Sequence, residues 1–149
     1  MNVHIDELAD LVGKDLGHSD WIVVSQERID TFADATDDHQ WIHVDAERAA
    51  RGPFGTTIGH GYLTLSLFIP LFSGLLDVAG VATKVNYGLN KVRFPSPVPA
   101  GSRIRLTATI AGVEEVAGDA ALVTLDGVIE IEGTDKPACV LQSVLRFYR

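Results

Sequence analysis

The spacing of hydrophobic residues changes about halfway along the chain. Before residue 80 the apolar positions mostly recur at helical intervals, and WIVVS at 21–25 is the one strand-like run. Ser25 and Asp45 are suitable N-caps, because their side-chain oxygens can accept hydrogen bonds from first-turn amides. The pattern therefore predicts three helices, over 5–12, 26–37 and 46–51, with a loop at GPFGTT (52–57).

The most apolar segment is HGYLTLSLFIPLFSGLL, residues 60–76. Its hydrophobic residues fall on all sides of a helical wheel, which predicts a helix that other structure covers. Pro70 is expected to kink it, because proline lacks the backbone N–H and clashes with the preceding turn. The apolar part has only 16 residues, fewer than the roughly 20 that span a bilayer. A buried helix is therefore expected, and no membrane partner.

Alternating or β-branched residues dominate the second half of the chain. They predict long antiparallel strands at 103–113, 121–133 and 138–148, and a further strand at the start of 86–102 that ends in a proline-rich loop. Helices first and strands later indicate an α+β fold in one domain over residues 1–149. A long antiparallel sheet wrapped around one buried apolar helix is the hot-dog arrangement.

The composition indicates which partners and which cellular compartment to expect. Twelve Lys and Arg against 20 Asp and Glu give a net charge of −8, and no basic run is present, so no nucleic-acid partner is expected. Cys139 is the only cysteine, and its apolar surroundings indicate a small buried residue rather than a nucleophile. A reducing compartment, the cytoplasm, is expected. The N-terminus has no basic start followed by an apolar run, so a signal peptide is not expected.

The candidate chemistry begins in DATDDHQWIHVD, residues 34–45. Short polar side chains at 36–38 weaken the preceding helix, so Asp38 is expected where it ends and His43 beyond a turn. On one continuous helix the two would lie about 140° apart. If the chain bends, a carboxylate and an imidazole beside apolar walls can share a water molecule. The alternative is a helix-ending acid and a partly buried histidine with a satisfied ring.

A zinc site was the other possibility at this bend. His39 and His43 are four residues apart, the spacing of two ligands on one helical face. Gln40 stands where the zinc-protease signature requires glutamate, and no third ligand is evident. We therefore expect no metal here.

A second candidate lies in IGHGYLTLS, residues 58–66. Gly61 stands where the buried helix should begin, and free amides there suit developing negative charge on a closely approaching carbonyl. Alternatively, Gly59 and Gly61 only turn the chain. His60 is interpreted as structural, and the hydroxyls of Thr64 and Ser66 receive no role.

Two cations, Lys91 and Arg93, lie in the strand that begins at residue 86. They could meet a phosphorylated carrier, or they could be the solvated end of a strand, which we favour slightly.

Three stretches together resemble the MaoC-like (R)-specific enoyl-CoA hydratases: FADATDDHQWIHVD (32–45), TTIGHGYLTLSLF (56–68) and NYGLNKVRFPSPVPAGSRI (86–104). The resemblance covers about residues 20–148. It implies that Asp38 and His43 converge on a catalytic water and that the Gly61 N–H binds the thioester carbonyl. The implied reaction is reversible syn addition of water to a trans-2-enoyl-CoA, giving the (R)-3-hydroxyacyl-CoA.

The resemblance also implies what accompanies that reaction. The substrate would be a thioester of CoA, or alternatively of acyl-carrier protein, with its acyl chain along the apolar helix, and no metal or redox cofactor would be needed. Trp41 would add bulk near the catalytic water. The bulky helix residues Leu63, Leu67, Phe68 and Leu71, which must contact the sheet or the ligand, would limit chain length. The exposed edges of a single hot-dog sheet predict a homodimer.

Two positions depart from the family's pattern, and two rival functions stay open. Gln40-Trp41 replaces a frequent Asn-Pro, and Ile69 stands where some members have a serine. A hot-dog thioesterase would bind the same ligands but release free CoA. A non-catalytic acyl-binding subunit would need neither Asp38 nor His43, so their presence argues against it.

Overall fold

The main sheet is antiparallel and curved, and the computed structural model describes it together with every other part of residues 1–149. Its strand order is β2-β6-β7-β8-β5, with β3 also paired to β6. The strands are β2 (Asp15–His18), β3 (Ile22–Val23), β5 (Thr83–Arg93), β6 (Arg103–Val116), β7 (Ala120–Ile131) and β8 (Cys139–Tyr148). The four long strands lie where alternation predicted them. The expected strand at 21–25 is reduced to the two residues of β3.

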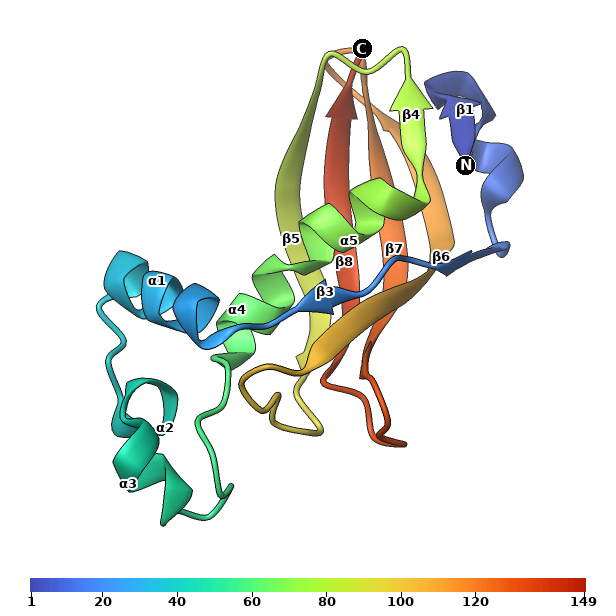
Figure 1. Cartoon of the computed structure of the whole chain (residues 1–149). Coiled ribbons are helices and arrows are strands. Elements are labelled where there is room, and N and C mark those ends of the chain that lie inside the picture. Colours follow the sequence, from blue (N-terminus) through green and yellow to red (C-terminus); the bar gives the residue numbers. More distant parts are fainter.

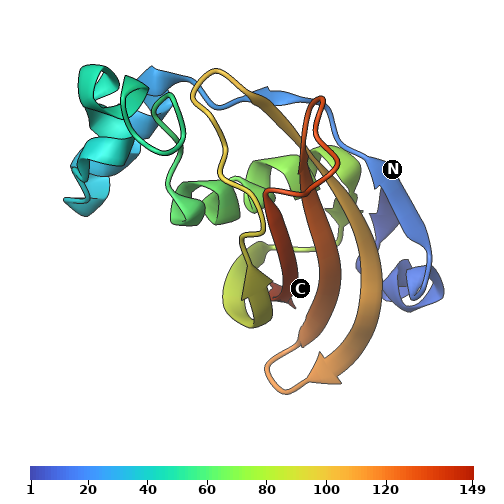
Figure 2. The ribbon, with the colours of Figure 1, turned by 90° about the horizontal axis from the view of Figure 1, so that it is seen from below.

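The apolar helix crosses the concave face of this sheet (Figures 1 and 2). It is divided into α4 (Gly61–Ser66) and α5 (Phe68–Leu75). Pro70 explains the division, because proline clashes with the carbonyl four residues earlier, which belongs to Ser66 at the end of α4. The kink expected at Pro70 is therefore present, and the α+β hot-dog arrangement is confirmed.

One side of the divided helix is not covered by its own chain. Its inner side joins the core with Leu63, Leu67, Phe68, Leu71, Phe72 and Leu75. On the other side Tyr62 is 71% exposed and Ile69 is also exposed. A helix that is apolar all round should be covered all round. The chain alone therefore leaves part of its most apolar helix open to solvent.

The N-terminal segment is a 3-10 helix, η1 (Ile5–Leu11), rather than the α-helix that its pattern suggested. Its buried residues, Ile5, Leu8 and Leu11, are spaced by three, which is the period of a 3-10 helix. Two short strands that the pattern did not predict, β1 (Asn2–His4) and β4 (Asp77–Ala79), pair in parallel beside it.

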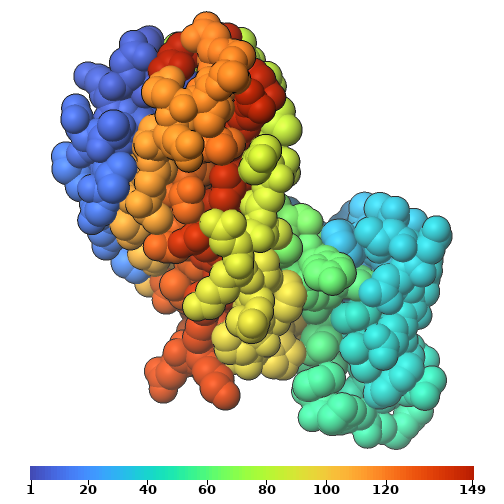
Figure 3. Space-filling view, turned by 180° about the vertical axis from the view of Figure 1, so that it is seen from behind, coloured from blue at the N-terminus to red at the C-terminus, as the bar shows by residue number.

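Residues 26–59 form a helical lobe that projects from one end of the sheet (Figures 1 and 3). It contains α1 (Gln26–Thr36), α2 (Trp41–Val44) and α3 (Ala46–Ala50). Chain segments on both sides of it, β3 and α4, connect it to the body. None of the helices is long and apolar enough to cross a membrane.

Candidate active site

The bend expected between Asp38 and His43 is present and begins at the end of α1. Asp37 takes a left-handed conformation with φ of 56°, and both its amide and that of Asp38 donate to the Ala33 carbonyl. A left-handed residue closing a helix is a common C-cap, and aspartate tolerates it better than most residues. The chain then enters α2, so His43 lies beyond the turn, as expected, and within a short helix of its own.

His43 is held at both its backbone and its ring. Its side chain is 6% exposed, and Nδ1 lies 2.7 Å from the Ile58 carbonyl oxygen. Because a carbonyl only accepts, Nδ1 carries the proton and Nε2 carries a lone pair in the neutral ring. Burial lowers the pKa of His43 below 6.5, a trend that the Ile58 carbonyl partly offsets. At neutral pH the ring is therefore a fixed, uncharged base.

The Asp38 carboxylate lies beside this base but faces solvent, with 52% of its side chain exposed. A carboxylate oxygen of Asp38 and ring nitrogens of His43 and His60 lie within 4.8 Å of one another. One water molecule making two hydrogen bonds spans such a separation. The structure therefore brings together the acid and the histidine that the sequence singled out.

His60 connects the two. Its ring stacks on that of His43, with centroids 3.8 Å apart and planes at 23°, and its Nε2 donates to the Asp38 backbone carbonyl at 2.9 Å. The stacking also bears on whether Asp38, His43 and His60 could bind a metal ion. Imidazole lone pairs lie in the ring planes, so two nearly parallel rings cannot both direct them at one ion. The donor set does not fit a metal.

Gly61 begins α4 and opens onto a cavity of about 330 Å³ that His43 also lines. Its φ is not positive, and neither is that of Gly59, so neither position requires glycine for a left-handed turn. A Cβ at Gly61 would instead lie 3.2–3.3 Å from the Phe94 ring. Because amides in the first turn of a helix have no intrahelical partner, the Gly61 N–H is free to bind a ligand oxygen.

A second set of hydrogen bonds, which holds the backbone of His43, was not predicted from the sequence. Gln26, the first residue of α1, donates from Nε2 to the His43 carbonyl at 2.7 Å. Its Oε1 accepts a hydrogen bond from the hydroxyl of the buried Thr57, two residues before Gly59. No local sequence signal marks these contacts, because they join residues 17 and 31 positions apart.

Other residues that the sequence highlighted lie outside the site. The Trp41 ring packs under Arg48, with its centroid 4.4 Å from the guanidinium carbon, and against Gly52. It does not line the cavity that His43 lines, although the sequence suggested that it would lie near the catalytic water. His39 is exposed and its ring is hydrogen-bonded to Asp34, so it does not form the zinc site with His43 that their spacing suggested.

Three further expectations can be compared with the structure. The exposed Lys91 and Arg93 do not line the cavity that contains His43. Cys139 is buried, and burial raises the pKa of its thiol to about 11, as befits an unreactive core residue. The Ser66 hydroxyl bonds to the Tyr62 carbonyl within its helix, whereas the Thr64 hydroxyl has no partner in the chain and lines the cavity.

Comparison with known proteins agrees with this geometry. The family model described as "MaoC like domain" matches residues 7–131. The chain is 52% identical to "3-hydroxyacyl-thioester dehydratase Z" of Mycobacterium tuberculosis over 96% of its own length and 95% of the relative's. It is 45% identical to "Nodulation protein N" of Rhizobium leguminosarum bv. viciae, covering 91% and 88%.

The fold has solved counterparts as well. The MaoC-like dehydratase from Rhodospirillum rubrum superposes with a TM-score of 0.75 at 21% identity, covering 98% of this chain and 97% of that one. The regions matched by the family model and by the 52% identical relative include both the bend and the start of α4, where the acid, the base and the free amide lie. The chain therefore belongs to the MaoC-like dehydratase family, whose name denotes hydro-lyase chemistry.

Proposed function

We propose that this protein is an (R)-specific hydro-lyase that interconverts (R)-3-hydroxyacyl thioesters and trans-2-enoyl thioesters, with coenzyme A as the carrier we would test first. The observation that carries the proposal is His43, whose Nδ1 is committed to the Ile58 carbonyl. Its Nε2 is thereby left as a base, on a ring that has a nitrogen within 4.8 Å of the Asp38 carboxylate. The 52% identical relative, a 3-hydroxyacyl-thioester dehydratase by name, supports the substrate class.

In the hydration direction His43 is the base. Nε2 takes a proton from a water that Asp38 orients, and the water oxygen forms a bond to the β-carbon. The electron pair of the carbon–carbon double bond forms a new double bond between the α-carbon and the carbonyl carbon, and the C=O pair moves onto the thioester oxygen, giving an enolate. The enolate collapses as the α-carbon takes a proton from the His43–Asp38 pair. Because both groups lie on the same side of the substrate, addition is syn; dehydration is the reverse.

The Gly61 amide is assigned to the thioester oxygen. It opens onto the cavity that His43 lines, so a carbonyl bound there has its adjacent carbons near the base. A preorganised donor aimed at a developing oxyanion contributes about 3–4 kcal/mol in other enzymes. Gly61→Ala should lower kcat, because the added methyl would lie only 3.2 Å from Phe94 and must shift the ring or the amide.

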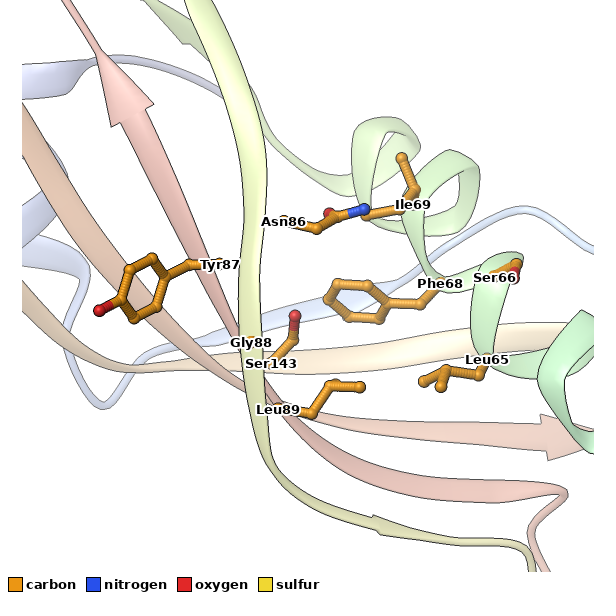
Figure 4. A pocket seen from close by; sticks show the side chains of 9 residues that line it. All are labelled: Leu65, Ser66, Phe68, Ile69, Asn86, Tyr87, Gly88, Leu89 and Ser143. Atoms are coloured by element: carbon orange, nitrogen blue, oxygen red, sulfur yellow. The ribbon is translucent and has the colours of Figure 1, made fainter.

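The acyl chain is assigned to a second cavity, of about 250 Å³, between α4–α5 and β5 (Figure 4). Its helical wall is Leu65, Phe68 and Ile69. Gly61 and Leu65 are four residues apart in α4, so they share one helical face, and Phe68 at the start of α5 continues the cavity wall.

This assignment modifies the expected tunnel lining. Of the four residues we expected to contact sheet or ligand, Leu63, Leu67 and Leu71 are buried in the core, and only Phe68 also lines this cavity. Efficiency should rise by about 0.8 kcal/mol for each methylene that fits and should then fall. A steady increase in kcat/KM through long chains would contradict a closed cavity.

The functional unit is proposed to be a homodimer joined through β5. This strand is an edge of the sheet, and it lies beside the apolar helix (Figure 3). Its side chains Val85, Tyr87 and Leu89 are exposed, as are Tyr62 and Ile69 of the helix. An apolar edge of this kind is covered in soluble proteins, and pairing with a second copy covers both partners at once.

Sedimentation of two matched variants tests the dimer. Val85→Lys lies on the exposed edge, whereas Val128→Lys lies at a similarly exposed position on the interior strand β7. Only the first should shift the protein from dimer to monomer. A wild-type protein that sediments as a monomer at micromolar concentration would contradict the proposal.

The reaction itself is tested with crotonyl-CoA, by following the loss of the enoyl absorbance and analysing the configuration of the hydroxyl product. A parallel assay for free thiol separates hydration from thioester hydrolysis. Hydration to the (R)-product without thiol release is expected. Thiol release, or no turnover of any enoyl or 3-hydroxyacyl thioester, would refute the proposal.

A further inference from the structure

His60 is buried, 3% exposed, and its side chain reaches both proposed catalytic residues at once. It precedes α4 as the N-cap residue but does not cap it, because it makes no side-chain bond to the first-turn amides. The ring turns back instead, covers one face of His43 and donates to the Asp38 carbonyl. Serine or aspartate would be the better choice for the helix alone.

The ring also carries an unsatisfied atom. Its Nδ1 is buried and has no hydrogen-bond partner. Buried polar atoms without partners destabilise a fold, and they are few in native structures. An apolar ring would avoid this cost while still stacking on Phe32 and His43. What it would lose is the bond from Nε2 to Asp38.

We propose that His60 is a positioning residue with two separable tasks: Nε2 fixes the Asp38 backbone at the bend, and the ring keeps water away from the face of His43. This inference rests on the proposed function. It assigns His60 no proton transfer, since its Nε2 is committed to a backbone carbonyl. The interpretation of His60 as structural is thereby sharpened to an effect on the catalytic pair.

The first task follows from where the tether acts. The Asp38 carbonyl lies immediately after the left-handed Asp37, where α1 ends: the Asp38 amide still donates to Ala33, but the carbonyl receives its hydrogen bond from His60. The carboxylate is otherwise poorly held, because its shortest contact is 3.5 Å from the Gln40 amide. A fixed backbone therefore sets the direction of a side chain that is half exposed. Misplacement of a catalytic group by about 1 Å can cost roughly 100-fold in rate.

The second task follows from what surrounds His43. The titratable groups that face it are His60 and Asp38, while the cavity wall carries no other titratable side chain: Phe54, Ile58, Thr64, Phe94, Ser96, Val98 and Ala138. Burial is the largest cause that lowers the pKa of His43. Removing the covering ring would admit water and move this pKa back toward 6.5.

Three substitutions separate the tasks. His60→Gln places an amide nitrogen where Nε2 lies and loses the ring. His60→Asn carries the same group on a chain one methylene shorter, which cannot reach Asp38. His60→Phe keeps a ring and loses the donor. Thermal unfolding identifies the variants that fold, and the Gln and Asn variants form a pair of equal polarity.

Two measurements are made on all four proteins. In turnover of crotonyl-CoA, we expect kcat of His60→Asn and His60→Phe to fall roughly 10- to 100-fold, with KM changed far less and His60→Gln close to wild type. In NMR titration without substrate, we expect the His43 pKa to stay low in His60→Phe and to rise in both amide variants.

The outcomes are distinct. Equal kcat in the Gln and Asn variants would refute the tether, and the same His43 pKa in all four proteins would refute the covering role. If the wild-type protein turns over no thioester, the proposed function fails, and the titration, which needs no substrate, still decides the covering role. If His60→Phe does not fold, the Gln–Asn pair decides the tether, and comparison of that pair with wild type decides the covering role.

Discussion

The sheet and the helical lobe are stabilised by different interactions. The cluster of 29 buried apolar residues comes from η1, β2, the central helix and strands β6–β8, and Ile29 is its only member within residues 26–59. The bend in the lobe is held instead by polar contacts of Gln26, His43 and His60.

This difference has a physical consequence. Apolar packing is non-directional and tolerates small shifts, whereas a hydrogen bond weakens steeply when its angle changes. The sheet can therefore supply most of the free energy of folding, while the lobe sets the direction of two side chains. Substitutions in the sheet should act on stability and those in the bend on turnover.

The largest effect is expected at the catalytic pair. His43→Gln and Asp38→Asn should each lower kcat about 1,000-fold or more without a comparable loss of stability, and the double variant should be little worse, because the two act as a unit. The controls are His39→Gln and Asp37→Asn, the same changes at exposed neighbours. Near-normal turnover by either folded single variant would contradict the assignment.

In the sheet, Phe147→Ala should act in the opposite way. Phe147 is fully buried on β8, and truncating such a ring lowers the free energy of unfolding by about 3–5 kcal/mol. Urea unfolding measures this loss, with Phe54→Ala in the exposed part of the lobe as the control. The folded fraction should keep nearly normal kcat; a large fall there would mean that the two regions are coupled.

Lowering the pH should reduce both turnover and stability through protonation of His43. Burial lowers its folded pKa below 6.5, so turnover in the hydration direction should stay high through pH 6.5 and fall about tenfold per unit below that lower pKa. Because the unfolded chain binds the proton at a higher pH, stability also decreases as pH falls below about 6.5. A rate that already declines above pH 7 as acid is added would contradict a base of lowered pKa.

A smaller effect is expected at Gln26, which holds the His43 backbone. Gln26→Met keeps the chain length but removes the donor to the His43 carbonyl and the acceptor for Thr57. We expect about a tenfold fall in kcat, equivalent to about 1.4 kcal/mol. Gln40→Met, at an exposed glutamine that makes no side-chain cap, is the matched control. Equal kcat in both variants would assign Gln26 to stability alone.

The smallest effect is expected on the outer face of the sheet. Arg103 pairs with Glu132 across β6 and the end of β7, and both are largely exposed. Arg103→Ala should change the free energy of unfolding by less than about 1 kcal/mol, and less still in high salt. A larger change in urea unfolding would mean that charge pairs stabilise the sheet as much as its apolar core does.

The sequence was sufficient where local patterns control structure. Alternation predicted the four long strands, and Pro70 predicted the break in the helix. The polar run at 36–38 predicted the bend that allows Asp38 and His43 to approach. The helix predicted over 5–12 is present as η1, but its 3-10 type was not predicted, because three apolar residues at intervals of three also fit one face of an α-helix.

The rest depends on contacts between distant residues. The tether from His60 to Asp38 spans 22 positions, and the bond from Thr57 to Gln26 spans 31, so no periodicity reports them. The orientation of Trp41 was missed for the same reason, since it depends on Arg48 and Gly52 meeting over its ring. Sequence thus identified the groups that can react but not those that hold them.

The strand order has a consequence for how the protein is made. β8 comes last in the chain among the strands of this sheet, yet it lies between β7 and β5, and its end, Tyr148, pairs with both Thr83 and Ala120. Until β8 has been synthesised, β5 has no partner strand, and part of the sheet that covers the apolar helix is missing. Contacts so distant in sequence form slowly, and the waiting segments are prone to aggregate. Loss of β8 would therefore leave β5 unpaired beside a sheet reduced to β2, β3, β6 and β7, and we expect such a chain to depend on chaperones.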